Sequence, residues 1–152
     1  MGQRRSAGIG GTLNMNKIIV AAAVIYNDQQ QILLVRKRNT AFFMQVGGKL
    51  EANELPEVTM LREIKEEIGA DAEIQQFIGR FETMAANEAD HQLVSYVYWV
   101  KLAQAPKIDA EIAEMRWLSL DADDLTDPAL LAPLTTEVVI PWCQQHFVSA
   151  EV

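Results

Sequence analysis

Short apolar stretches separated by turn residues recur along the chain and predict six β-strands. Each stretch is rich in β-branched or aromatic residues, which favour a pleated, half-buried conformation. Asn27 and Asp28 form the turn between the first two stretches. The polar segment 84–91 is expected to be a loop that could overhang a site. The predicted strands cover residues 17–26, 32–36, 46–50, 72–83, 92–102 and 115–118.

The segment after the third strand has the signals of a helix. Pro56 suits the first helical turn, where its missing N–H costs nothing, and Gly69 is a candidate left-handed stop. We therefore expect a helix over residues 56–68, with Asn53 as a candidate N-cap. At about 100° per residue, its apolar positions fall on one face. They are Val58, Leu61, Ile64 and Ile68.

A second helix is predicted at the end of the chain. It should cover residues 130–147 and break near Pro141, because proline removes a helical hydrogen bond. Residues 120–125 are expected to form a short helix or turn. Strands on both sides of a central helix, with another helix at the end, predict an α/β fold. In this fold a mixed β-sheet is sandwiched between helices.

The other face of the first helix is acidic. Glu63, Glu66 and Glu67 fall within a sector of about 100°, with Arg62 at its flank. Like charges at this spacing repel in water, whereas a bound divalent cation makes their proximity favourable. Oxygen ligands without Cys or His indicate Mg²⁺ or Mn²⁺ rather than Zn²⁺. The alternative is an ordinary solvated helix face, in which Arg62 and Lys65 pair with the acids.

The helix belongs to a longer pattern that favours the metal-binding interpretation. From Gly48 the chain reads G-x5-E-x7-R-E-U-x-E-E-x-G, where U is the aliphatic Ile64. This pattern is the Nudix box, which spans residues 48–70, and the chain resembles the Nudix hydrolases of the MutT-like type. Two positions depart from the family. Many members have proline where this chain has Val46, and a bulkier aliphatic residue where it has Ala70.

The resemblance implies a fold, a reaction and roles for the acids. The fold would be the Nudix α/β/α sandwich, within a single domain over residues 16–148. Glu66 and Glu67 would be the core ligands of Mg²⁺, and Glu63 would be a ligand or the general base. Bound metal would neutralise a diphosphate and lower the pKa of the attacking water.

The resemblance also assigns supporting roles around these acids. Arg62 would hold the glutamates by a bidentate salt bridge, which suits a planar guanidinium better than lysine. Glu54 would support the loop or touch a second metal. Gly47 would contribute a backbone carbonyl to the metal, and Gly48 would allow a close turn.

Further candidates lie outside the box. One distal acid often serves the family as ligand or base, and Glu111 and Glu114 precede the Arg116-Trp117 pair as that acid would. We favour Glu114, because it is nearer to the strand that contains Trp117, although both acids could be surface carboxylates. Basic residues at the end of the second strand resemble those that bind substrate phosphates in some members. They are Arg36, Lys37 and Arg38, and the alternative is a solvated cluster.

Composition limits the class of protein and its partners. The 152 residues fit one soluble globular domain, and a net charge of −8 argues against binding a nucleic-acid polymer. No stretch approaches the ~20 apolar residues of a membrane span. A single cysteine, Cys143, favours a reducing compartment, and we expect a cytoplasmic protein. Residues 1–15 are expected to be a flexible leader, with a secretion signal or a functional arm as alternatives.

The leading functional hypothesis is a Mg²⁺-dependent pyrophosphohydrolase that cleaves a nucleoside diphosphate linked to another moiety. A nucleoside triphosphate, in an ordinary or oxidised form, is the favoured substrate, with the monophosphate and pyrophosphate as products. An ADP-sugar or a dinucleotide polyphosphate is the alternative substrate. An alternative of another class is a non-catalytic Nudix-fold module that senses a nucleotide. A homodimer is left open.

Overall fold

The observed elements follow the predicted order. Within residues 16–121 and 130–148, which the computed structural model describes, the chain forms six β-strands and two helical segments. The strands are β1 (Asn16–Ile25), β2 (Gln31–Lys37), β3 (Val46–Lys49), β4 (Ala72–Met84), β5 (His91–Leu102) and β6 (Ile112–Ser119). One helical segment is α1 (Pro56–Ile68), and the other joins η4 (Thr135–Val139), α2 (Ile140–Cys143) and η5 (Gln144–Val148). The leader expected at 1–15, and most of the turn expected at 120–125, lie outside the described residues.

The strands pair into two sheets. Four strands lie in the order β3-β1-β5-β4, in which β1 and β5 are parallel and the other neighbours are antiparallel. β2 and β6 form an antiparallel pair of their own. A single antiparallel bridge between Val35 and Met44 links β2 to the segment that enters β3. The larger sheet is therefore mixed, as predicted.

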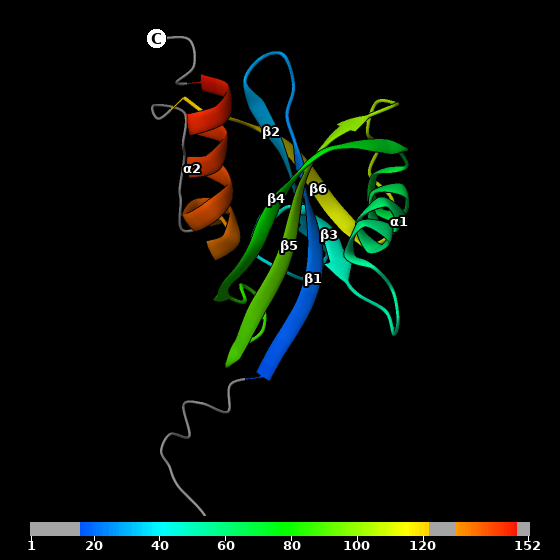
Figure 1. Ribbon diagram of the computed structural model, residues 1–152, viewed down its shortest axis with the longest axis vertical. Coiled ribbons are helices and arrows are strands. Elements are labelled where there is room, and N and C mark those ends of the chain that lie inside the picture. Colours follow the sequence, from blue (N-terminus) through cyan, green and yellow to red (C-terminus); the bar gives the residue numbers. More distant parts are fainter. Residues whose placement is uncertain (1–15, 122–129, 149–152) are drawn as a thin grey trace, which may run out of the picture.

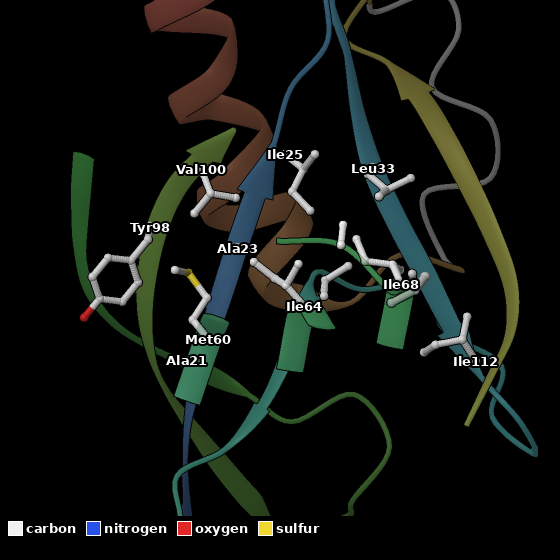
Figure 2. Close-up of a cluster of buried hydrophobic side chains, with 13 residues drawn as sticks. Ala21, Ala23, Ile25, Leu33, Met60, Ile64, Ile68, Tyr98, Val100 and Ile112 are labelled. Carbon is white, nitrogen blue, oxygen red and sulfur yellow. The ribbon is translucent and has the colours of Figure 1, made fainter. Parts of the chain in front are cut away.

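Helices cover both faces of the larger sheet, and each encloses a separate part of the core (Figure 1). Alternation along β1 sends Ala21 and Ala23 towards α1, and Ala22 and Val24 towards the α2 segment. Figure 2 shows the first part of the core, in which side chains of α1 meet those of β1, β2 and β5. The predicted α/β sandwich is confirmed.

α1 has the predicted ends but a different N-cap. It begins at Pro56 and ends at Gly69, whose left-handed φ of 65° lets its N–H donate to the carbonyl of Lys65. The prediction that Asn53 is the N-cap is wrong, because Leu55 occupies that position without a side-chain cap. Asn53 instead has a positive φ of 64°, which asparagine tolerates, and forms the turn that leads into the helix.

The buried face of α1 is rotated from the predicted one. Val58 was expected in the core but is 49% exposed, whereas Met60, Ile64 and Ile68 are fully buried. These three residues are spaced by four, so they form one stripe along the helix. Glu67, which lies beside this stripe, is only 4% exposed. The rotation therefore carries one carboxylate of the acidic face into the protein.

The C-terminal helix does not break at Pro141, so that prediction is wrong. The helical segment is continuous from Thr135 to Val148, with wide turns on both sides of α2. In the first of them the N–H of Ile140 donates to the carbonyl of Thr135, five residues earlier. Such π-type turns accommodate a residue without an N–H, because the hydrogen-bond ladder is already shifted there.

Candidate active site

Two glycines bring β3 and α1 into close approach. Gly47 and Gly48 pair with Ala22 and Ala21 of β1. A Cβ at Gly47 would overlap the carbonyl oxygen of Ala21, and a Cβ at Gly48 would lie 2.6 Å from Cδ of Glu63. Gly48 therefore leaves the space in which the carboxylate of Glu63 lies against the strand, while Gly47 allows β3 to approach the backbone of β1.

Arg62 is the centre of the acidic cluster. Its Nε and Nη2 donate to the two carboxylate oxygens of Glu54, at 2.9 and 2.8 Å. Its Nη1 donates to Oε2 of Glu63 at 2.9 Å and lies 3.5 Å from Glu66. One guanidinium thus joins the loop before α1 to two acids of the helix, and a planar fork has the geometry for this.

Glu54 is held as an ion by this network. The hydrogen bonds from Arg62 contribute most to lowering its pKa to about 2, followed by those from the Thr59 hydroxyl and the Glu51 N–H. The pKa of Arg62 is raised in turn, chiefly by its hydrogen bonds to Glu54. Both carboxylate oxygens of Glu54 are therefore already hydrogen-bonded, to Arg62 and to groups around the start of α1.

Glu67 is the buried member of the cluster. Its pKa is raised to about 8, mainly by burial; Lys37 and the Gly47 N–H act in the opposite direction and favour the charged form, while the nearby Glu63 adds to the increase. Lys37 Nζ lies 3.9 Å from Oε2 of Glu67, and the Gly47 N–H donates to Oε1 at 3.4 Å. A positive charge placed beside Glu63 and Glu67 would offset both the burial and the repulsion.

The donor set suits a hard cation. Glu66 is half exposed, and both of its oxygens accept only long hydrogen bonds of 3.5 Å from Nη1 of Arg62, which leaves them accessible to other groups. Among the described residues, no group of three or more His, Cys, Asp or Glu side chains is placed so that it could hold a metal ion, so these residues form no cage. Mg²⁺ does not need such a cage, because it keeps several waters and binds one or two carboxylates together with substrate phosphate. One or two of Glu63, Glu66 and Glu67 could serve as ligands in that mode.

The three basic candidates at the end of β2 have different surroundings. Lys37 faces α1 and contacts Glu67. Arg36 points to the other face, where its Nε donates to Glu114 at 3.2 Å and its Nη1 to the carbonyl of Thr40. Arg38 contributes a backbone N–H to the carbonyl of Glu111. The structure thus brings Lys37, but not the Arg36 side chain, to the acids.

The two distal acids also differ in position. β6 starts at Ile112, three residues earlier than predicted, so Glu114 lies within the strand and pairs with Arg36 across the ladder. Glu111 lies in the loop before β6, and this loop runs past the end of α1. There the N–H of Asp109 donates to the carbonyl of Glu67. The backbone around Glu111 is therefore adjacent to the acidic cluster.

A pocket of about 360 Å³ opens beside the glycine pair. Its walls come from β1, the β2–β3 connection, the loop after β4, and the segment before η4. Most of its lining is aliphatic, with Lys37 and Lys49 as its cations. Lys49 Nζ lies 3.7 Å from Glu88 of the loop after β4. Of the segment expected to overhang a site, residues 84–88 line this pocket.

Sequence analysis missed three residues of this pocket region, namely Gln45, Lys49 and Thr135. Gln45 and Lys49 line the pocket. The hydroxyl of Thr135 donates to Oε1 of Gln45 at 2.7 Å, across 90 positions of sequence. Such a pairing has no signal in a single sequence, whereas Lys49 follows the glycine pair directly and lies within the Nudix box, which could have identified it.

Comparisons with known proteins relate the chain to one family. The sequence model of the NUDIX domain matches residues 16–142. No curated protein sequence matches the chain significantly. None of the helices in the described residues has the length and apolar character needed to cross a bilayer.

Solved structures share the fold at low sequence identity. The MutT protein from Methanosarcina mazei Go1 has a TM-score of 0.70 and 20% identity, over 87% of this chain and 96% of that one. The E. coli ORF135 protein has a TM-score of 0.64 and 24% identity, over 95% and 96% of the two chains. A UDP-X diphosphatase has a TM-score of 0.64 and 22% identity. That match covers 86% of this chain but only 64% of the diphosphatase.

Proposed function

The chain belongs to the Nudix family of hydrolases, which act on diphosphate bonds, and we propose that it is a Mg²⁺-dependent pyrophosphohydrolase of nucleoside triphosphates. The observation that supports this proposal most strongly is the complete acidic cluster around Arg62, which lies next to a pocket of nucleoside size. The proposal treats residues 16–148 as one catalytic domain. It also assigns the protein to the cytoplasm, in keeping with the free, buried Cys143.

Glu63, Glu66 and Glu67 would hold Mg²⁺, with the carbonyl of Gly47 as a further ligand. When bound, the metal would offset the charge of the diphosphate and lower the pKa of the attacking water. Arg62 fixes the carboxylate of Glu63 against Gly48, so that the acid is oriented before substrate arrives. Lys37 adds a positive charge beside Glu67, where a substrate phosphate would approach.

A single nucleoside fits the pocket better than two. Pockets that bury drug-sized ligands enclose about 300–1,000 Å³, and 360 Å³ lies near the lower end of that range. Lys37 and Lys49 lie in the wall that includes Gly47 and Gly48, where a phosphate chain would pass towards the acids. These features favour a nucleoside triphosphate over a dinucleotide polyphosphate. A nucleotide sugar is the second candidate, because the UDP-X diphosphatase has a similar fold.

The alternative of another class, a non-catalytic nucleotide sensor, is disfavoured by the completeness of the cluster. A module that only binds nucleotides has no need for three acids at one site, since their mutual repulsion is costly without a cation. In this chain all three acids are present, and the most buried of them has a raised pKa.

The first prediction concerns the metal. Hydrolysis should require millimolar Mg²⁺ or Mn²⁺, because open carboxylate sites bind these ions through water and phosphate rather than in a closed cage. Phosphate release from a panel of nucleoside triphosphates, nucleotide sugars and dinucleotide polyphosphates, with added pyrophosphatase, tests both substrate and metal. Full turnover in excess EDTA would refute the metal requirement, and binding without hydrolysis of any member would favour the sensor.

The second prediction separates the distal acids. Glu111→Gln should lower kcat by about 100–10,000-fold, the range expected for loss of a general base, whereas Glu114→Gln should leave kcat close to that of the wild type. This expectation replaces the initial preference for Glu114, whose carboxylate is paired with Arg36. If Glu111 is the base, its variant should also change the pH–rate profile. If both variants keep wild-type kcat, Glu63 becomes the best candidate for the base.

A further inference from the structure

The side-chain amide of Gln45 has two polar atoms, of which one is hydrogen-bonded and the other is not. The residue immediately precedes β3 and is 6% exposed. Its Oε1 accepts the hydroxyl of Thr135, which is fully buried. Its Nε2 is shielded from solvent and has no hydrogen-bond partner among the described residues. A buried amide donor without a partner is costly and rare, so its presence requires an explanation.

The position of Gln45 connects this orphan donor to the pocket. Gln45 lines the pocket together with Gly47 and Gly48 of the following strand β3, and with Ala132 and Leu134 from the segment before η4. The surrounding walls are mainly aliphatic, so they offer few competing hydrogen bonds. Met44 and Met84 also contribute, and their unbranched side chains can shift to let a ligand reach the donor.

We propose that Gln45 is a specificity-determining residue, whose side-chain N–H donates to a carbonyl oxygen of the nucleobase. This inference rests on the proposed function, because it assumes that the pocket receives the base. Thr135 engages the amide oxygen, so Gln45 is left with donors only. Guanine, cytosine, uracil and thymine all carry carbonyl oxygens, whereas the exocyclic group of adenine is itself a donor. Adenine offers ring nitrogens as acceptors but no carbonyl oxygen, so an enzyme whose donor is placed for a carbonyl oxygen should discriminate against adenine nucleotides.

The competing explanation is structural. The bond between Gln45 and Thr135 joins β3 to the C-terminal helical segment, and it could serve only as a tether between them. Loss of a tether would lower the stability of the protein and would change the activity towards every substrate by the same factor. The ranking of the substrates by kcat/KM would therefore stay the same. The two explanations therefore differ in base preference, which is measured independently of folding.

The test uses Gln45→Met, which keeps the length of the side chain and removes the donor, together with Thr135→Val. The matched control is Thr136→Val, because Thr136 is the next residue and its hydroxyl contacts the carbonyl of Pro133 instead of Gln45. The measurements are kcat/KM for GTP, CTP, UTP and ATP with Mg²⁺, and the Kd of the corresponding diphosphates in EDTA. Unfolding temperatures report the fold of each variant.

We expect the wild type to prefer its best carbonyl-bearing base over adenine by about tenfold or more, as sites built around a hydrogen bond do. Gln45→Met should reduce that preference to about twofold. Thr135→Val should also reduce the preference over adenine, because the amide of Gln45, once freed from Thr135, can turn its oxygen towards the base. Thr136→Val should leave it unchanged.

An unchanged preference in a folded Gln45→Met enzyme would overturn the inference, while hydrolysis itself would still support the proposed function. A wild-type preference for ATP would likewise overturn it. If the wild type hydrolyses no nucleotide, the proposed function fails, and the diphosphate Kd values still decide the role of Gln45. If Gln45→Met does not fold, Thr135→Val decides, because only the base-reading role predicts a narrower preference for it.

Discussion

Replacing Glu67 by glutamine is expected to lower kcat about 100-fold or more, while making the metal-free protein more stable at pH 8. The loss of activity follows from removing one of the three acids proposed to hold Mg²⁺, since a preorganised electrostatic group at a reacting centre is worth about 100–1,000-fold. Glu66→Gln should cost a similar factor. Steady-state kinetics at saturating Mg²⁺ measure both effects.

The gain in stability follows from the burial of Glu67. Its pKa is raised from the ordinary value of 4.5 to about 8, whereas in the unfolded chain it titrates near the ordinary value. Between these two pH values the folded protein retains a proton that the unfolded chain has lost, so the free energy of unfolding falls as the pH rises. Glutamine is neutral and removes this penalty. The gain should be larger at pH 8 than at pH 5.

Thermal unfolding of the metal-free proteins measures the second effect. A gain of about 1 kcal/mol corresponds to about 2–4 °C in a protein of this size. The control is Glu73→Gln, which neutralises an exposed carboxylate on β4. It should change neither the activity nor the pH dependence of the unfolding temperature. A Glu67→Gln protein that unfolds more readily at pH 8, or turns over normally, would show that the acidic face is structural.

The fold could be predicted because its signals are local. Pro56 and Gly69 mark the ends of α1, and both were identified from residue type alone. Most strand boundaries agree within two residues, since β-rich runs are separated by turn residues. The Nudix box then fixed the junction of strand, loop and helix, and Gly48 must be small because Glu63 lies against it.

The orientation of the elements could not be predicted from these signals. Periodicity defines a helix face but not its rotation against the sheet, so Val58 was expected to be buried and Glu67 was not. The sequence grouped Arg36, Lys37 and Arg38 as basic candidates without indicating that Lys37 lies beside the acids of α1. The bond between Gln45 and Thr135 depends on how the C-terminal helix packs, and a single sequence holds no record of that contact.

Replacing Arg62 by lysine should lower kcat/KM by about 10–100-fold, the usual cost of losing a residue that orients metal ligands. A lysine keeps the charge but cannot bond both oxygens of Glu54 and reach Glu63 as well. Arg62→Ala should be more damaging, because it leaves these acids without a counter-charge. The control is Arg80→Lys, since the half-exposed Arg80 of β4 pairs with Glu82 of the same strand and hydrogen-bonds to Tyr96 of β5.

The Arg62→Lys variant should also reveal how Glu54 contributes to the dependence of protein stability on pH. Because the folded pKa of Glu54 is lowered to about 2, the stabilisation from its ion pair is complete above the ordinary value of 4.5 and disappears as the pH falls towards 2. The Arg62→Lys variant lacks much of this stabilisation at every pH. Its deficit in unfolding temperature should therefore be largest near neutral pH and shrink as the pH is lowered through this window. A deficit that grows in acid would contradict the pairing of Glu54 with Arg62, and would assign the loss of activity to a general failure of the fold.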